Sequence, residues 1–191
     1  MKKKIALLLT TFTMVSCLSV CNAEAADKTE TVVPTIHDAA VESGSVTVYD
    51  FGASKLHVYN TGDALGDVAY IVEGKDALIG IELPSFTANL DTWQNYIAGL
   101  DKPMNDLFLC DHATGASYVE GMNVYGTQGA QNSIASGSTY ATTQGLYETF
   151  GDDFHGGADL ANINKVVSGA VTVTVDCCGV YAHCRAKLRS S

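Results

Sequence analysis

The chain has 191 residues, a formal net charge of −10 at pH 7 and 47% hydrophobic residues. This length fits a short leader and one domain that is large enough to bury a sizeable core. So acidic a chain argues against nucleic acid or an anionic membrane surface as a partner, because both would repel it.

Residues 1–25 have the layout of a secretory signal peptide. Three lysines precede a mostly apolar run that ends at Val20, and small residues after it offer cleavage sites. The run is too short and too rich in Ser and Thr for a transmembrane helix, and no other stretch is apolar enough to span a bilayer. The sequence predicts export to the periplasm or the medium. A lipoprotein is the weaker alternative, because the pattern upstream of Cys17 is poor.

Three segments are expected after the leader. Residues 26–44 are polar and predict a linker or loose N-terminal arm, in which His37 would be an exposed loop histidine. Residues 45–175 carry the apolar runs of a folded domain. Residues 176–191 form a Cys-rich, basic tail that differs in composition from the acidic domain before it.

The domain begins with an expected β-hairpin over residues 45–61. Its first arm alternates apolar and polar residues, as a half-buried strand does. In the second arm, His57 would point to the face opposite Leu56 and Val58. We therefore expect His57 to face solvent or a sheet surface and not to act as a ligand.

Two apolar runs and a helix follow the hairpin. Residues 68–72 and 77–83 are nearly continuously apolar, which fits strands that are covered on both faces by helices. Ser85 is a good N-cap, and Trp93 is expected in the core with its N–H bonded to a partner. Apolar residues then recur at three- and four-residue spacing, which predicts an amphipathic helix: Phe86, Leu90, Trp93, Tyr96, Ile97 and Leu100.

The second half of the domain contains three more expected strands, at residues 104–109, 122–125 and 166–175, and the last of them is broken at Gly169. Residues 128–147 are rich in Gly, Ser and Thr, so their helix propensity is poor and we expect helix only in part. A hairpin followed by strands that alternate with helices predicts a mixed sheet with outer helices, in the α+β class.

The central stretch resembles the N-terminal half of a metallo-β-lactamase-fold protein. The paired runs VAYIVEG and DALIGIEL are similar to a strand pair of that family, with Glu82 where an Asp is usual. The helix LDTWQNYIAGL then leads into a strand. After this strand, Asp111-His112-Ala113-Thr114-Gly115 matches the end of the family signature H-x-H-x-D-H-x-x-G.

This resemblance implies an αββα sandwich, here incomplete, because the family's second half would begin about where this chain ends. It also implies one or two zinc ions, or iron, at the edge of the sheet. In that family a metal-bound hydroxide hydrolyses β-lactams, thioesters, phosphodiesters and related bonds.

The metal motif is degenerate. In this register the two leading histidines of the signature fall on Leu107 and Leu109, which cannot bind metal. In the other register His112 is the first histidine, and the remaining ligand positions fall on Thr114, Ala116 and Ser117. A catalytic zinc site takes about three protein ligands and a water. Asp111 and His112 are therefore the candidate metal ligands, and no catalytic residue is assigned. In the alternative reading, Asp111 caps the turn after its strand and no metal binds. His155 is disfavoured as a distant ligand.

The tail offers a second group of metal-ligating residue types. Cys177, Cys178, His183 and Cys184 would suit zinc, but their spacing matches no standard zinc motif. A reading frame disrupted near residue 176 is an alternative explanation for the change in composition.

Two functions follow from these observations. The first is an exported metal-dependent hydrolase by ancestry, with a degenerate and truncated site. The second is a non-catalytic periplasmic binding or interaction module on the same scaffold. In both cases the ligand is an unidentified small molecule. Half of a sandwich would leave one sheet face exposed, so a homodimer is also expected.

Overall fold

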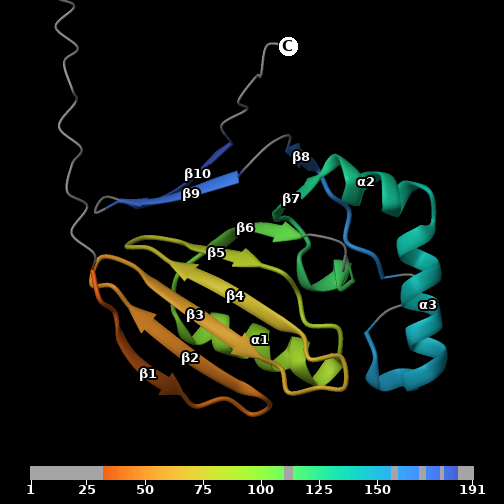
Figure 1. Cartoon of the computed structure of the whole chain (residues 1–191), viewed down its shortest axis with the longest axis horizontal. Helices are drawn as coiled ribbons and strands as arrows, with labels where there is room; N and C mark the ends of the chain where they lie inside the picture. The colour runs from red at the N-terminus through yellow and green to blue at the C-terminus, as the bar shows by residue number, and fades with distance from the viewer. Residues whose placement is uncertain (1–31, 110–113, 156–158, 168–170, 177–178, 185–191) are drawn as a thin grey trace, which may run out of the picture. The chain divides into compact units, whose positions relative to one another are not determined.

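An eight-stranded β-sheet forms the centre of the computed structural model, which describes residues 32–109, 114–155, 159–167, 171–176 and 179–184. The strands lie side by side in chain order (Figure 1). They are β1 (Thr35–Ala39), β2 (Ser45–Asp50), β3 (Lys55–Asn60), β4 (Val68–Glu73), β5 (Leu78–Ile81), β6 (Met104–Leu109), β7 (Asn123–Thr127) and β8 (Lys165–Val167).

The sheet changes from antiparallel to parallel pairing at β5. Strands β1 to β5 pair antiparallel, and β5 to β8 pair parallel. Helix α1 (Thr87–Gly99) connects β5 to β6, because a parallel pair needs a crossover. The loops that follow β5, β6 and β7 therefore meet at one edge of the sheet, here named the carboxyl edge. The edge at which β5 and β6 begin is named the amino edge.

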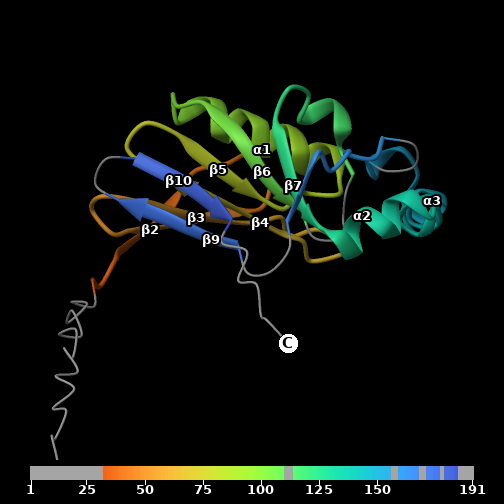
Figure 2. The same cartoon turned by 90° about the horizontal axis from the view of Figure 1, so that it is seen from above.

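Helix α1 covers one face of the sheet (Figure 2). Its residues Leu90 and Trp93 are 0% and 1% exposed and belong to one core cluster with Val46, Ile71 and Leu107 of the strands. The helix predicted over residues 86–100 is therefore confirmed. Together with the mixed sheet, it also confirms the α+β class.

Two details of the predicted helix are wrong. The N-cap is Phe86, which makes no side-chain cap hydrogen bond. Ser85 belongs to the loop before the helix, where its amide donates to Asp67 Oδ2 at 3.2 Å and its carbonyl accepts from the His155 amide at 2.7 Å. Trp93 Nε1 is buried without a hydrogen-bond partner among the described residues, because the indole lies within the hydrocarbon core.

Part of the segment expected as a loose arm is a strand. Within residues 26–44, β1 pairs with β2 and places Ile36 opposite Tyr49. His37 is exposed as expected, but it lies on this strand. An edge strand buries few side chains (Ile36 is 59% exposed), so its sequence lacks the apolar alternation that would have revealed it.

The C-terminal half is more ordered than its propensities indicate. Helices α2 (Gln128–Ala135) and α3 (Ser138–Phe150) occupy the Gly- and Ser-rich stretch that was expected to be only partly helical. The Thr127 hydroxyl caps α2 by accepting from the Ala130 amide at 3.1 Å. Figure 1 shows both helices beyond the ends at which the β5 and β6 arrows point, that is, at the carboxyl edge.

The strand predicted over residues 166–175, with a break at Gly169, is two strands, which lie on either side of residues 168–170. β8 joins the large sheet, whereas β9 (Val171–Asp176) pairs with β10 (Gly179–Cys184) in a separate antiparallel sheet. Strand structure thus extends into the segment expected as an atypical tail.

The face of the sheet opposite α1 is mostly apolar and half-buried, and the hydrogen-bonded side chains of Asp106 and Asn123 also lie on it. It carries Leu56, Val58, Val72, Phe108 and Tyr125, and the rings of the last two stack at 4.7 Å. An αββα sandwich requires a second sheet packed on this face, and that arrangement remains a prediction. Among the described residues, none of the helices combines the length and the hydrophobicity of a transmembrane span.

Candidate functional site

The predicted metal ligands Asp111 and His112 lie outside the described residues. The residues that flank them are described. Leu109 ends β6 at the carboxyl edge, and Thr114 forms an isolated β-bridge with Leu160. Thr114 is 1% exposed, and its Oγ1 has no hydrogen-bond partner among the described residues.

A cavity of about 220 Å³ lies at the carboxyl edge, and Thr114 lines it. Seven of its described lining residues carry a hydroxyl group, and the remaining two, Leu146 and Phe154, are apolar. The hydroxyl-bearing residues come from the loops after β5 and β6 and from helices α2 and α3: Ser85, Thr114, Ser133, Ser138, Thr139, Thr142 and Thr143. We name this cavity the hydroxyl pocket.

The N-terminus of α3 contributes to the hydroxyl pocket. Ser138 and Thr139 are its first two residues, and the N-cap Gly137 has no side chain with which to satisfy their amides. The first amides of a helix lack acceptors within the helix and carry partial positive charge. Thr139 Oγ1 donates to Ser133 Oγ at 3.0 Å and so ties α3 to α2.

Asp159 holds the segment that carries Thr114. Its backbone carbonyl accepts from the Gly115 amide at 2.8 Å, and its carboxylate accepts from Ser117 Oγ at 2.9 Å and contacts His155 Nε2. Burial alone would raise the pKa of Asp159, but the hydrogen bonds from His155 and Ser117 outweigh burial and lower it. Asp159 is therefore ionised and acts as an anchor for this loop.

Tyr118 lies beside the same cluster. Its ring meets the His155 ring edge-on, with 5.0 Å between centroids, and its hydroxyl donates to Asp91 Oδ1 at 2.8 Å. Burial, followed by this hydrogen bond to Asp91, raises the pKa of Tyr118 to about 12. Its hydroxyl therefore stays protonated and links this loop to helix α1.

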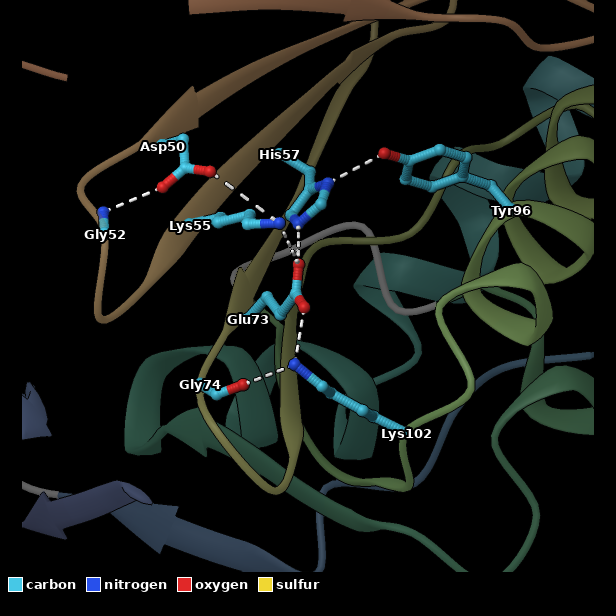
Figure 3. A network of polar contacts seen from close by, with 8 residues as sticks. All are labelled: Asp50, Gly52, Lys55, His57, Glu73, Gly74, Tyr96 and Lys102. Carbon is cyan, nitrogen blue, oxygen red and sulfur yellow. Dashed lines mark hydrogen bonds and ion pairs between the residues drawn. The ribbon is translucent and has the colours of Figure 1, made fainter. Parts of the chain in front are cut away.

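A second polar cluster lies at the amino edge and centres on His57 (Figure 3). Tyr96 of α1 bonds to His57 Nδ1 at 2.7 Å, and Glu73 Oε2 lies 2.9 Å from His57 Nε2. Burial lowers the pKa of His57 more than Glu73 raises it, so the ring is neutral. Burial also raises the pKa of Tyr96 to about 12. The consistent arrangement is a Tyr96 hydroxyl that donates to Nδ1 and an Nε2–H that donates to the Glu73 carboxylate.

Glu73 connects His57 to two lysines in this cluster. Lys102 Nζ donates to its Oε1 at 2.5 Å and to the Gly74 carbonyl at 2.8 Å, and Lys55 Nζ lies 4.0 Å from its Oε2. Burial alone would raise the pKa of Glu73, but the hydrogen bonds from Lys102 and His57 outweigh it and lower the pKa. The network joins β3, β4, α1 and the start of β6, so its main effect is on stability.

The placement of His57 differs from the expected one. The alternation with Leu56 and Val58 was predicted correctly, but the face that His57 occupies is the one under α1, where it is 3% exposed. The sequence offered one usable signal, because Glu73 also ends an apolar strand. A His and a Glu that are both buried on paired strands are expected to form a hydrogen bond with each other.

The described residues contain no group of three or more His, Cys, Asp and Glu side chains that could hold a metal ion. His155 and Asp159 form a pair only. Cys177 and Cys178 lie outside the described residues. Nothing is described for the side chains of Asp111, His112, His183 and Cys184, and we derive no chemical step from a zinc or iron ion.

The fold and its pockets define an α+β domain with a mixed sheet and a hydroxyl-lined cavity at the carboxyl edge. No family model matches the sequence, and no curated protein matches it. Among solved structures, the chain is similar to the DIM-1 metallo-β-lactamase exposed to ceftazidime, with a TM-score of 0.40 and 11% sequence identity. The match covers 75% of this chain and 56% of that one, so the chain spans about half the length of this neighbour.

Proposed function

We propose that the chain is a binding module for a small uncharged polar molecule, which it holds in the hydroxyl pocket. The observation that carries this proposal is the Thr114 hydroxyl, which is buried in the pocket lining without a partner among the described residues. An unsatisfied buried hydroxyl costs about 1–3 kcal/mol, and a ligand that bonds to it would recover that free energy.

The chemistry of the lining supports an uncharged ligand. Hydroxyl groups both donate and accept hydrogen bonds, so they suit ligands that carry hydroxyl or amide groups. The described lining residues include no charged side chain, and a charged ligand would therefore meet no counter-ion there. Phe154 and Leu146 provide an apolar surface for the carbon atoms of the ligand. The volume corresponds to about seven water molecules, which limits the ligand to the size of a monosaccharide or smaller.

Thr114→Val tests this function. Valine keeps the shape of threonine and removes the hydroxyl, so we expect affinity for the bound probe to fall about tenfold while the fold is retained. Saturation-transfer NMR with glucose, glycerol and acetamide as probes measures binding. Thr149→Val is the matched control, because Thr149 lies on α3, bonds to the Gly145 carbonyl and does not line the pocket. Absence of saturable binding by all three probes, or an equal loss in Thr149→Val, would contradict the proposal.

Metal-dependent hydrolysis is the second candidate function. It is favoured by the position of Asp111 and His112 in the sequence, between the end of β6 and Thr114, and by the His155–Asp159 pair near the same edge. We expect near-stoichiometric zinc or iron in the purified protein, lost in His112→Ala, if this function is correct. Metal-free protein with intact probe binding would support the binding module alone.

Export and self-association belong to the same proposal. Residues 1–25 would direct the chain to the periplasm or the medium, where small polar solutes are available to it. The half-buried apolar sheet face would allow a homodimer.

A further inference from the structure

The described residues concentrate their positive charge at one place. Across the ranges that the structure describes, four residues are Lys or Arg, in a chain of net charge −10. Three of these four, Lys55, Lys75 and Lys102, line a single cavity of about 370 Å³ at the amino edge. The fourth, Lys165, lies on β8. A random distribution would not be expected to gather three of four cations around one cavity.

Separate elements bring the three lysines together. Lys55 begins β3, Lys75 lies in the turn between β4 and β5, and Lys102 precedes β6. The rest of the lining is Glu73 and small residues of two tight turns: Gly52, Ala53, Ser54 and Gly74. Figure 3 shows Lys55 and Lys102 converging on Glu73 beside Gly74. The small residues leave the cavity open to a ligand.

The charges that line this cavity do not cancel. Glu73 is the single carboxylate in the described lining, and it already accepts from His57 and Lys102. Lys55 Nζ lies 3.7 Å from Oδ2 of Asp50, which is not among the described lining residues. Lys75 forms no ion pair with any described residue, and its neighbour Asp76 does not line the cavity. The lining therefore carries three cations and one anion.

We propose that this cavity is an anion site that binds a small molecule through a phosphate monoester group. Lysine ammonium groups bind phosphate as point charges with three donors each. A phosphate dianion would pair with Lys75, which has no ion-pair partner among the described residues, and would be attracted by Lys55 and Lys102 beside it. The site lies at the edge of the sheet opposite the hydroxyl pocket and is independent of the function proposed there.

The test is a titration of the full chain, as purified, at low ionic strength, followed by ¹H–¹⁵N NMR. The probes are inorganic phosphate, glycerol phosphate and succinate. We expect saturable shifts at the amides of Gly52 and Gly74 with both phosphates and weaker effects with succinate. Lys75→Gln should weaken phosphate binding about tenfold, because it removes one charged contact from an exposed position that the fold does not need.

Lys165→Gln is the matched control, since it removes the same charge from the described lysine that lies outside the cavity. It should leave phosphate binding unchanged. The proposal is overturned by shifts that do not saturate, by equal weakening in Lys165→Gln, or by tighter binding of succinate than of glycerol phosphate. The last result would assign the site to dicarboxylates.

Discussion

Replacing Glu73 with leucine should lower the free energy of unfolding at neutral pH by about 3 kcal/mol. Leucine fits the volume but leaves the buried His57 Nε2–H without an acceptor and removes the partner of Lys102. His57 is 3% exposed, so water cannot replace the lost carboxylate there. Lys102 can turn to solvent, since its side chain is 26% exposed. The loss of its ion pair therefore lowers the free energy of unfolding less than the loss of the His57 hydrogen bond does.

Urea denaturation of both proteins at several pH values checks this expectation. The folded pKa of Glu73 lies below its ordinary value of 4.5, so its stabilising effect is complete above that pH and is lost as the pH falls further. The difference between the wild type and Glu73→Leu should therefore shrink in acid. Glu73→Gln, which keeps one acceptor for His57, should lose less than Glu73→Leu. Equal stability of the wild type and Glu73→Leu at neutral pH would show that the network does not stabilise the fold.

Gly44→Ala should destabilise the protein by about 3 kcal/mol, for two separate reasons. Gly44 has φ of +73°, in the left-handed region that alanine adopts only with strain. A Cβ at this position would also lie 2.3 Å from the Asn60 carbonyl oxygen and 2.9 Å from that of Thr61. Both neighbours are backbone atoms, so the strands themselves would have to shift.

Gly52→Ala separates the two causes. Gly52 has φ of +85°, but a Cβ there would meet no atom within 4 Å. It should therefore lose only the conformational part, about 1 kcal/mol. Thermal unfolding of the two variants beside the wild type measures the difference. If Gly52→Ala is as damaging as Gly44→Ala, the close approach to Asn60 and Thr61 has no energetic role.

Sequence periodicity predicted the elements that bury one clear face. Leu90 and Trp93 recur at helical spacing and lie in the core, and the apolar runs around Ile71 and Leu107 are buried strands. Elements that bury little were missed or underestimated. Strand β1 is mostly exposed. Helices α2 and α3 are rich in Ser, Thr and Gly, which lower intrinsic helix propensity, and several of their Ser and Thr residues line the hydroxyl pocket.

The candidate sites were harder to predict, because they depend on contacts between distant segments. The sequence drew attention to Asp111 and His112, which lie outside the described residues. Nothing local marks Thr114 as a buried, unpartnered hydroxyl, since its environment is made by helices later in the chain. Likewise, Lys55 and Lys102 are ordinary surface lysines until β3 and the start of β6 bring them to Glu73.

The change of pairing at β5 divides the sheet into an antiparallel part, β1 to β5, and a parallel part, β5 to β8. Closing the loops between paired strands costs less entropy in the antiparallel part than in the parallel part. Each strand from β1 to β4 pairs with the strand that follows it after a short connection; for example, Glu73 at the end of β4 pairs with Leu78 at the start of β5. The parallel part requires long-range closures, because Leu78 pairs with Met104 and Tyr125 pairs with Lys165. Local contacts form quickly and distant ones slowly. We therefore expect the antiparallel meander to form the nucleus of folding and the carboxyl edge with the hydroxyl pocket to be assembled on it last.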